Sequence, residues 1–165
     1  MKDKLKEYIE KNIENQLFYK KKSVEIANNY IEECFESSLS YGNINEFIKQ
    51  KDEYNNFQSL LFKLIDERNL KDSDVYNKVH IDRRLFSKIR NDSNYHPSKE
   101  TIILLGLSLE LNENEIEELL NSASYSLPKN NYYDLIIRFC FINKIYKLTK
   151  VNKLLDEYNC KLFYY

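Results

Sequence analysis

Three of the five arginines in this 165-residue chain fall within eight residues, at positions 83, 84 and 90. A guanidinium group is planar, always charged and forked, so it forms paired hydrogen bonds with phosphates and with the acceptor edge of guanine. Lys78 and Lys88 lie in the same stretch and add ammonium groups. These residue types at this density suit contact with a polyanion.

Two interpretations of this cationic cluster remain open. The five cations and the neighbouring Asp82 sum to +4, whereas residues 56–127 as a whole carry nine basic and twelve acidic residues. In the first interpretation the cluster contacts phosphates and bases, and a good bidentate arginine–guanine pair discriminates by about 1–3 kcal/mol. In the second it is a solvated helix face, or pairs with Asp72, Asp74 and the acidic helix that follows Asn112, at about 0–1 kcal/mol per pair.

The composition favours helices and excludes several other classes. Apolar residues make up 42% and charged residues 31%, with only two glycines and two prolines. So few turn-forming residues argue against a many-stranded barrel or sandwich and against a Pro/Gly-rich disordered chain. The net charge of −1 provides no global attraction to nucleic acid or membrane, so any such contact must be local.

The chain has no motif typical of an enzyme, a metal site or an export signal. The three cysteines, Cys34, Cys140 and Cys160, are widely spaced and fit inert thiols in a reducing cytoplasm. His80 and His96 have no further ligands at zinc spacing, and two glycines cannot build most phosphate loops. The N-terminus is charged and the apolar runs are short. We predict a non-enzymatic cytoplasmic protein without metal, cofactor or membrane partner.

The first third of the chain predicts a helical arm. Apolar residues recur every four positions between 2 and 22, which is typical of an amphipathic helix. The same period continues over 24–35, and a short helix follows, with Asn43 and Glu46 at its N-cap and N3 positions. The polar stretch 49–56 then separates this arm, residues 1–55, from the rest.

Residues 56–127 predict five short helices, of which the second and third are joined by a tight turn at His80. The expected starts are Asp72 or Ser73 for the second helix, Asp82 for the third, Ser98 for the fourth and an Asn112–Glu115 capping box for the fifth. Two further helices, over 132–143 and from Thr149, form a C-terminal extension, residues 128–165. The expected fold is all-α, with a core of five helices flanked by an arm and an extension.

The strings LKDSDVYNKVHIDRRLFSKIR and YHPSKETIILLGLSLELNENEIEELL resemble the five-helix DNA-binding domain of the lambda-repressor-like, or XRE, family. The resemblance covers residues 57–123 and implies a helix-turn-helix whose recognition helix is 82–90. The core positions it implies are Leu70, Val75, Val79, Ile81, Phe86 and Ile89. The DNA contacts it implies are Arg83, Arg84, Ser87 and Lys88, with Leu85 placed to meet a thymine methyl, while Lys71, Lys78 and Arg90 complete the candidate set.

The chain departs from the family pattern in the second helix and the turn. Lys71 and Asp72 stand where the family has Thr-Gln, and Tyr76 replaces a small residue. His80 replaces the turn glycine and therefore faces the positive φ angle that glycine adopts easily.

A second resemblance runs from residue 57 to the C-terminus. The strings ELNENEIEELLNSASYSL and YYDLIIRF look like an uncharacterised bacterial helical module that is often appended to macrodomains and other domains. It implies either a DNA tether or a docking surface. We therefore predict a non-catalytic binder of double-stranded DNA, a regulator or tethering accessory, which pairs as a homodimer through the arm or the YYDLIIRFCFIN segment. The alternative is a protein-interaction module that contacts its partner through Tyr76, Leu85 and the C-terminal aromatics.

Overall fold

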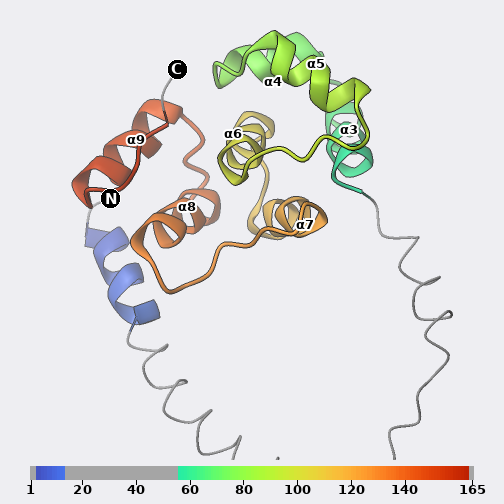
Figure 1. Cartoon of the computed structure of the whole chain (residues 1–165). Helices are drawn as coiled ribbons and strands as arrows, with labels where there is room; N and C mark the ends of the chain where they lie inside the picture. Colours follow the sequence, from blue (N-terminus) through green and yellow to red (C-terminus); the bar gives the residue numbers. More distant parts are fainter. Residues whose placement is uncertain (1–2, 14–55, 164–165) are drawn as a thin grey trace, which may run out of the picture. The chain divides into compact units, whose positions relative to one another are not determined.

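The structure, a computed structural model, describes residues 3–13 and 56–163, and every regular element in these two ranges is an α-helix (Figure 1). The predicted all-α class is therefore confirmed for these residues. The chain divides between Tyr54 and Asn55 into two units. In the first unit a helix covers residues 3–13, the start of the amphipathic helix expected over 2–22. The elements expected between residues 14 and 55 lie outside the described residues.

Seven helices follow in the second unit, joined by short connections. They are α3 (Phe57–Glu67), α4 (Asp72–Lys78), α5 (Arg83–Asn91), α6 (Lys99–Leu109), α7 (Glu113–Ser122), α8 (Tyr132–Ile142) and α9 (Leu148–Glu157). The five helices expected within 56–127 are all present. The two helices of the extension are present as well, and α9 begins one residue before the expected Thr149.

Side-chain caps set most of these boundaries. The Asp82 carboxylate accepts from the Arg84 backbone N–H at 2.6 Å, and the Ser98 hydroxyl accepts from the Thr101 N–H at 3.2 Å. The capping box of α7 is complete, because the Asn112 side chain accepts from the Glu115 N–H while the Glu115 carboxylate accepts from the Asn112 N–H. The predictions for these three helix starts are confirmed.

Glu115 is held in its ionised form by this arrangement. Partial burial alone would raise its pKa, but the Asn112 backbone N–H and the Arg68 guanidinium more than offset burial, so the pKa lies below the usual value for a glutamate. The Glu115–Arg68 pair, at 2.8 Å, also joins the start of α7 to the end of α3.

The start of α4 and the position of Leu70 differ from the prediction. The N-cap of α4 is Lys71, without a side-chain hydrogen bond, so neither Asp72 nor Ser73 caps it. Asp72 and Asp74 instead lie in the first turn, where the helix dipole favours negative charge. Leu70 is 37% exposed and not part of the core, because it lies in the connection before α4 and follows Asn69, whose φ is +52°. The other five predicted core residues are buried.

The turn between α4 and α5 closes on a left-handed residue. His80 has a φ of +56°, so this histidine accepts the conformation that glycine usually takes. The Ile81 N–H donates back to the Tyr76 carbonyl at 2.9 Å and satisfies the end of α4. Val79 and Ile81 are buried on either side, which anchors the turn to the core.

Helix α6 lies at the centre of the second unit, between the α4–α5 pair and α7 and α8 (Figure 1). Most of its residues are buried, which fits a helix that is apolar on all sides. Gly106 permits the close approach, since a Cβ atom there would lie 2.5 Å from Ile116 Cδ1 and 3.2 Å from Phe141 Cζ.

Ion pairs show which neighbouring elements lie at each end of α6. At its N-terminal end Lys99 pairs with Asp134 at the start of α8 (2.6 Å), and Glu100 pairs with Lys161 after α9 (3.0 Å). At its C-terminal end Glu110 pairs with Lys78 at the end of α4 (2.6 Å). The start of α8 and Lys161 after α9 therefore lie at one end of α6, and the end of α4 lies at the other.

Helix α8 packs mainly within the chain. Its residues 134–137, 139, 140 and 141 are buried, and only Tyr132 and Ile142 are substantially exposed large apolar residues. Arg138 of α8 pairs with Glu113 at 2.7 Å and also with Glu117, so this arginine joins α8 to α7. The segment YYDLIIRFCFIN therefore covers the core and leaves little apolar surface for a second copy.

The two lysines at the N-terminal end of α6 offer a test of this packing. Lys99→Met should lower the free energy of unfolding by about 3 kcal/mol, because Asp134, only 4% exposed, would lose its cation. Lys161→Met should cost less than about 1 kcal/mol, since the Lys161–Glu100 pair is exposed. Urea denaturation followed by circular dichroism measures both, and equal losses would contradict the buried pair.

Candidate nucleic-acid interface

Helix α5 presents two adjacent guanidinium groups at its beginning. Arg83 and Arg84 are its first two residues, both are exposed, and neither forms an ion pair with any described residue. The opposite face of α5 is fixed by Phe86 and Ile89, which are 2% exposed. Because α5 is held from that side, its cationic face points outward.

Aromatic contacts hold Phe86 against the neighbouring helices. Its ring lies 5.5 Å from the ring of Tyr76 in α4 and 6.1 Å, edge to face, from that of Phe62 in α3. Tyr76 is half-buried, so the larger residue that replaces the expected small one fills space between α4 and α5. This packing gives α5 a fixed orientation relative to α4.

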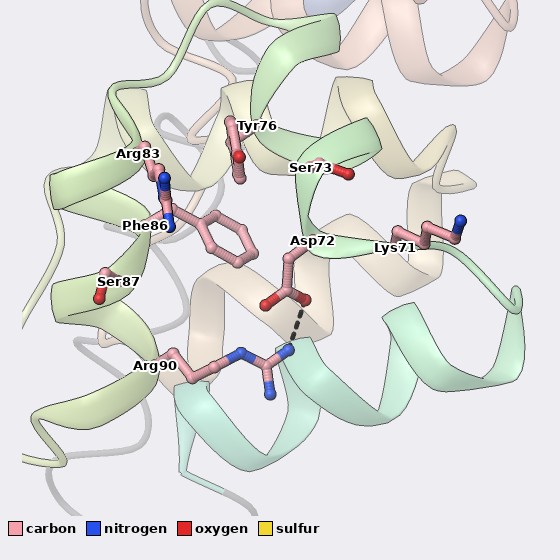
Figure 2. A pocket seen from close by; sticks show the side chains of 8 residues that line it. All are labelled: Lys71, Asp72, Ser73, Tyr76, Arg83, Phe86, Ser87 and Arg90. Atoms are coloured by element: carbon pink, nitrogen blue, oxygen red, sulfur yellow. Dashed lines mark hydrogen bonds and ion pairs between the residues drawn. The ribbon is translucent and has the colours of Figure 1, made fainter.

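A pocket of about 400 Å³ opens between α4 and α5 (Figure 2). Its lining residues are Lys71, Asp72, Ser73, Tyr76, Arg83, Phe86, Ser87 and Arg90. Figure 2 shows the Phe86 ring pointing from α5 into this space and the Lys71 side chain extending away from it. The sequence patterns did not identify Ser73 or Phe86 as pocket residues, because only the packing of the two helices brings them together.

Arg90 is bound within the domain. Its guanidinium pairs with the Asp72 carboxylate at 2.5 Å, as drawn in Figure 2, and lies 3.9 Å from the centre of the Phe62 ring. The Gln58 side chain also donates to the Ile89 carbonyl at 3.0 Å and to that of Arg90. Arg90 therefore joins α5 to α3 and α4, and it neutralises the carboxylate that opens α4.

Lys78 is similarly engaged. Its ammonium group donates to the Ser108 carbonyl at 3.0 Å and pairs with Glu110 at 2.6 Å. For Lys78 and Arg90 the structure thus agrees with the interpretation of intrachain ion pairs. These two of the eight candidate residues are held by the fold.

The other candidates keep an outward position. Lys71 is exposed and, like Arg83 and Arg84, forms no ion pair with a described residue. Lys88 is exposed and lies 4.5 Å from the centre of the Tyr95 ring. Ser87 is exposed, and its hydroxyl accepts from the Asn91 amide at 3.1 Å, while Leu85 is only half-buried. The exposed cations of the α4–α5 pair that form no ion pair with a described residue are therefore Lys71, Arg83, Arg84 and Lys88.

The remaining chemically interesting groups form no comparable site. Burial raises the pKa of the Cys140 thiol to about 12 and also raises that of Cys160, so neither described thiol is activated. The Tyr133 hydroxyl is buried without a hydrogen-bond partner, and burial raises its pKa. Tyr132 is 49% exposed and stacks on Tyr158, whereas Tyr164 and Tyr165 lie outside the described residues.

Within residues 3–13 and 56–163, no three histidine, cysteine or carboxylate side chains gather as metal ligands would. None of the helices in these ranges combines the length and apolar character needed to cross a membrane.

No family model matches this chain, and neither a curated protein nor a solved structure is similar to it. The resemblance to the XRE family accordingly stays a prediction.

Two arginine substitutions test which cations stabilise the fold and which only face outward. Arg90→Ala should lower the free energy of unfolding by about 1–2 kcal/mol, because it removes both the contact with Phe62 and the ion pair with Asp72. Arg83→Ala should change it by less than about 0.5 kcal/mol, since Arg83 is exposed and unpaired. Urea midpoints measure the difference, and a larger loss for Arg83→Ala would contradict this assignment.

Proposed function

We propose that this chain is a non-catalytic protein that binds double-stranded DNA through α4, the turn at His80 and α5, as a regulator or a DNA-tethering accessory. The observation that carries the proposal is the exposure of Arg83 and Arg84 at the beginning of α5, without a carboxylate partner among the described residues. The other interpretation of the sequence was that carboxylates of the same chain neutralise these two guanidinium groups. The exposure of both arginines gives no support to that interpretation.

The geometry matches the demands of major-groove binding. In a helix-turn-helix, the second helix enters the groove with its N-terminal residues nearest the base edges. Arg83 and Arg84 occupy that end of α5, and Ser87 and Lys88 follow one turn later. The guanidinium groups would bind the O6 and N7 atoms of guanine, and the hydroxyl and ammonium groups would bind phosphates. Leu85 offers only its exposed part to a thymine methyl.

One of the two carboxylates in the first turn of α4 is compensated within the chain. Asp72 pairs with Arg90, so this carboxylate no longer presents an uncompensated charge to a phosphate. Asp74 is exposed in the first turn, and Lys71 stands just before it. The four outward cations at Lys71, Arg83, Arg84 and Lys88 would neutralise up to four phosphates, which would contribute about −3.6 to the slope of log binding constant against log salt concentration.

One feature favours the alternative, docking of a protein partner on the same face. The pocket between α4 and α5 has an aromatic wall formed by Tyr76 and Phe86 and a cationic rim at Lys71 and Arg83. Such a pocket would suit an apolar or acidic side chain of a partner. Docking driven by this wall would depend weakly on salt, whereas DNA binding must depend on it strongly.

Charge reversal at the start of α5 tests the proposal. Arg83→Glu/Arg84→Glu should abolish the mobility shift of a random-sequence duplex at 200 mM salt, because two attractive charges become repulsive to phosphate. The fold should tolerate the change, since both residues are exposed and acidic residues are favourable in the first turn of a helix.

The matched control is Lys63→Glu/Lys129→Glu, which changes the net charge equally at exposed positions in α3 and in the connection before α8. We expect this control to retain most of the shift. Equal binding by wild type and the arginine variant would refute recognition through α5 and favour the docking module.

A further inference from the structure

A second cationic surface lies outside the α4–α5 pair. Residues 135–155 contain no aspartate or glutamate, and they include four lysines at or after the end of α8: Lys144, Lys147, Lys150 and Lys153. All four are exposed, and none forms an ion pair with a described residue. We call them the α9 lysine surface. Their positive charges are available to a ligand outside the chain.

The packing of α9 explains why these lysines point outward. Leu148, Val151, Leu154 and Leu155 of α9 are buried. Lys150 and Lys153 are three residues apart and fall on the opposite face of the helix. Lys147 is the N-cap of α9, and Lys144 follows α8 with a φ of +55°.

The nearest carboxylates do not neutralise this surface. Glu110 and Glu115 face Tyr146, which lies between Lys144 and Lys147, and with burial they raise the pKa of its phenol. Both carboxylates are already engaged within the chain, since Glu110 pairs with Lys78 and Glu115 pairs with Arg68. Asp156 and Glu157 follow Lys153 at the i+3 and i+4 positions of α9, so they reduce the charge near Lys153 but lie at the opposite end of the helix from Lys147.

Lys144 and Lys147, the first two residues of the α9 lysine surface, lie at the same end of α6 as the end of α4. Glu110, the C-cap of α6, pairs with Lys78 at the end of α4. Phe141 near the end of α8 lies against Gly106 of α6, and its ring is 6.3 Å from the ring of Tyr146, which lies between the two lysines. The opposite end of α6 is marked by the Lys99–Asp134 pair. Two cationic surfaces on one end of a rigid core can face the same extended polyanion.

We propose that the α9 lysine surface binds the backbone phosphates of DNA outside the stretch covered by α5. This inference rests on the proposed function. The residue types support a division of roles, because lysine attracts phosphate as a point charge while the forked arginines of α5 suit base edges. The extension after residue 128 thereby adds affinity without adding sequence specificity.

The test uses the full chain with the substitutions Lys144→Ala/Lys147→Ala/Lys150→Ala. Binding to a random duplex long enough to extend beyond α5 is measured from 50 to 200 mM salt. Loss of three phosphate contacts should make the slope of log binding constant against log salt concentration less steep by about 2.7. The loss of affinity between 50 and 200 mM salt should therefore be about 40-fold smaller for the variant than for the wild type. The control Lys63→Ala/Lys129→Ala/Lys161→Ala removes the same charge from exposed positions elsewhere and should keep the wild-type slope.

The outcomes separate the two proposals. A wild-type slope in the α9 lysine variant, together with loss of binding in Arg83→Glu/Arg84→Glu, overturns the second surface alone. A reduced slope in the lysine variant with unchanged binding by the arginine variant supports the lysine surface and overturns recognition through α5. Absence of DNA binding by the wild type overturns both. In a further outcome, the wild type sediments with phosphatidylserine vesicles and the lysine variant does not, while the salt slope of DNA binding is the same for both. This outcome assigns the α9 lysine surface to lipid and overturns the DNA assignment.

Discussion

Burial of α6 on nearly every side constrains where the other helices of the second unit lie. The helix offers almost no polar face to water, so α4, α7 and their neighbours must cover it. Gly106 lets Ile116 and Phe141 approach its backbone. The side chains left outside are therefore presented by a close-packed core, which holds them in defined positions. The cations at the start of α5 owe their fixed geometry to this packing.

The same core separates structural charges from available ones. Charges at helix ends that meet another helix, such as Lys78 with Glu110 and Arg90 with Asp72, stabilise the arrangement of elements. Charges without an ion-pair partner among the described residues, including Arg83 and Arg84, remain exposed. A chain with a net charge of −1 can thus present local positive surfaces, because its acidic residues are partly used in binding its own cations.

Local signals in the sequence were sufficient to predict most helix starts. Asp82, Ser98 and Asn112 cap their helices through backbone N–H groups only two or three residues away, so spacing alone identifies them. Arg90 could not be assigned in this way, because its partners Asp72 and Phe62 are distant in sequence and meet it only after the helices pack. The prediction that Leu70 is buried was wrong for a related reason. Leu70 lies in a connection, so no regular helix face directs its side chain toward the core.

Amide chemical shifts test most directly whether the start of α5 is free to bind a polyanion. Titration of the ¹⁵N-labelled full chain with a short random duplex should shift the backbone resonances of residues 82–88 in the first turns of α5, with smaller changes in α4. A spectrum that stays unchanged on addition of duplex, or shifts confined to helices other than α4, α5 and α9, would contradict DNA recognition by this surface.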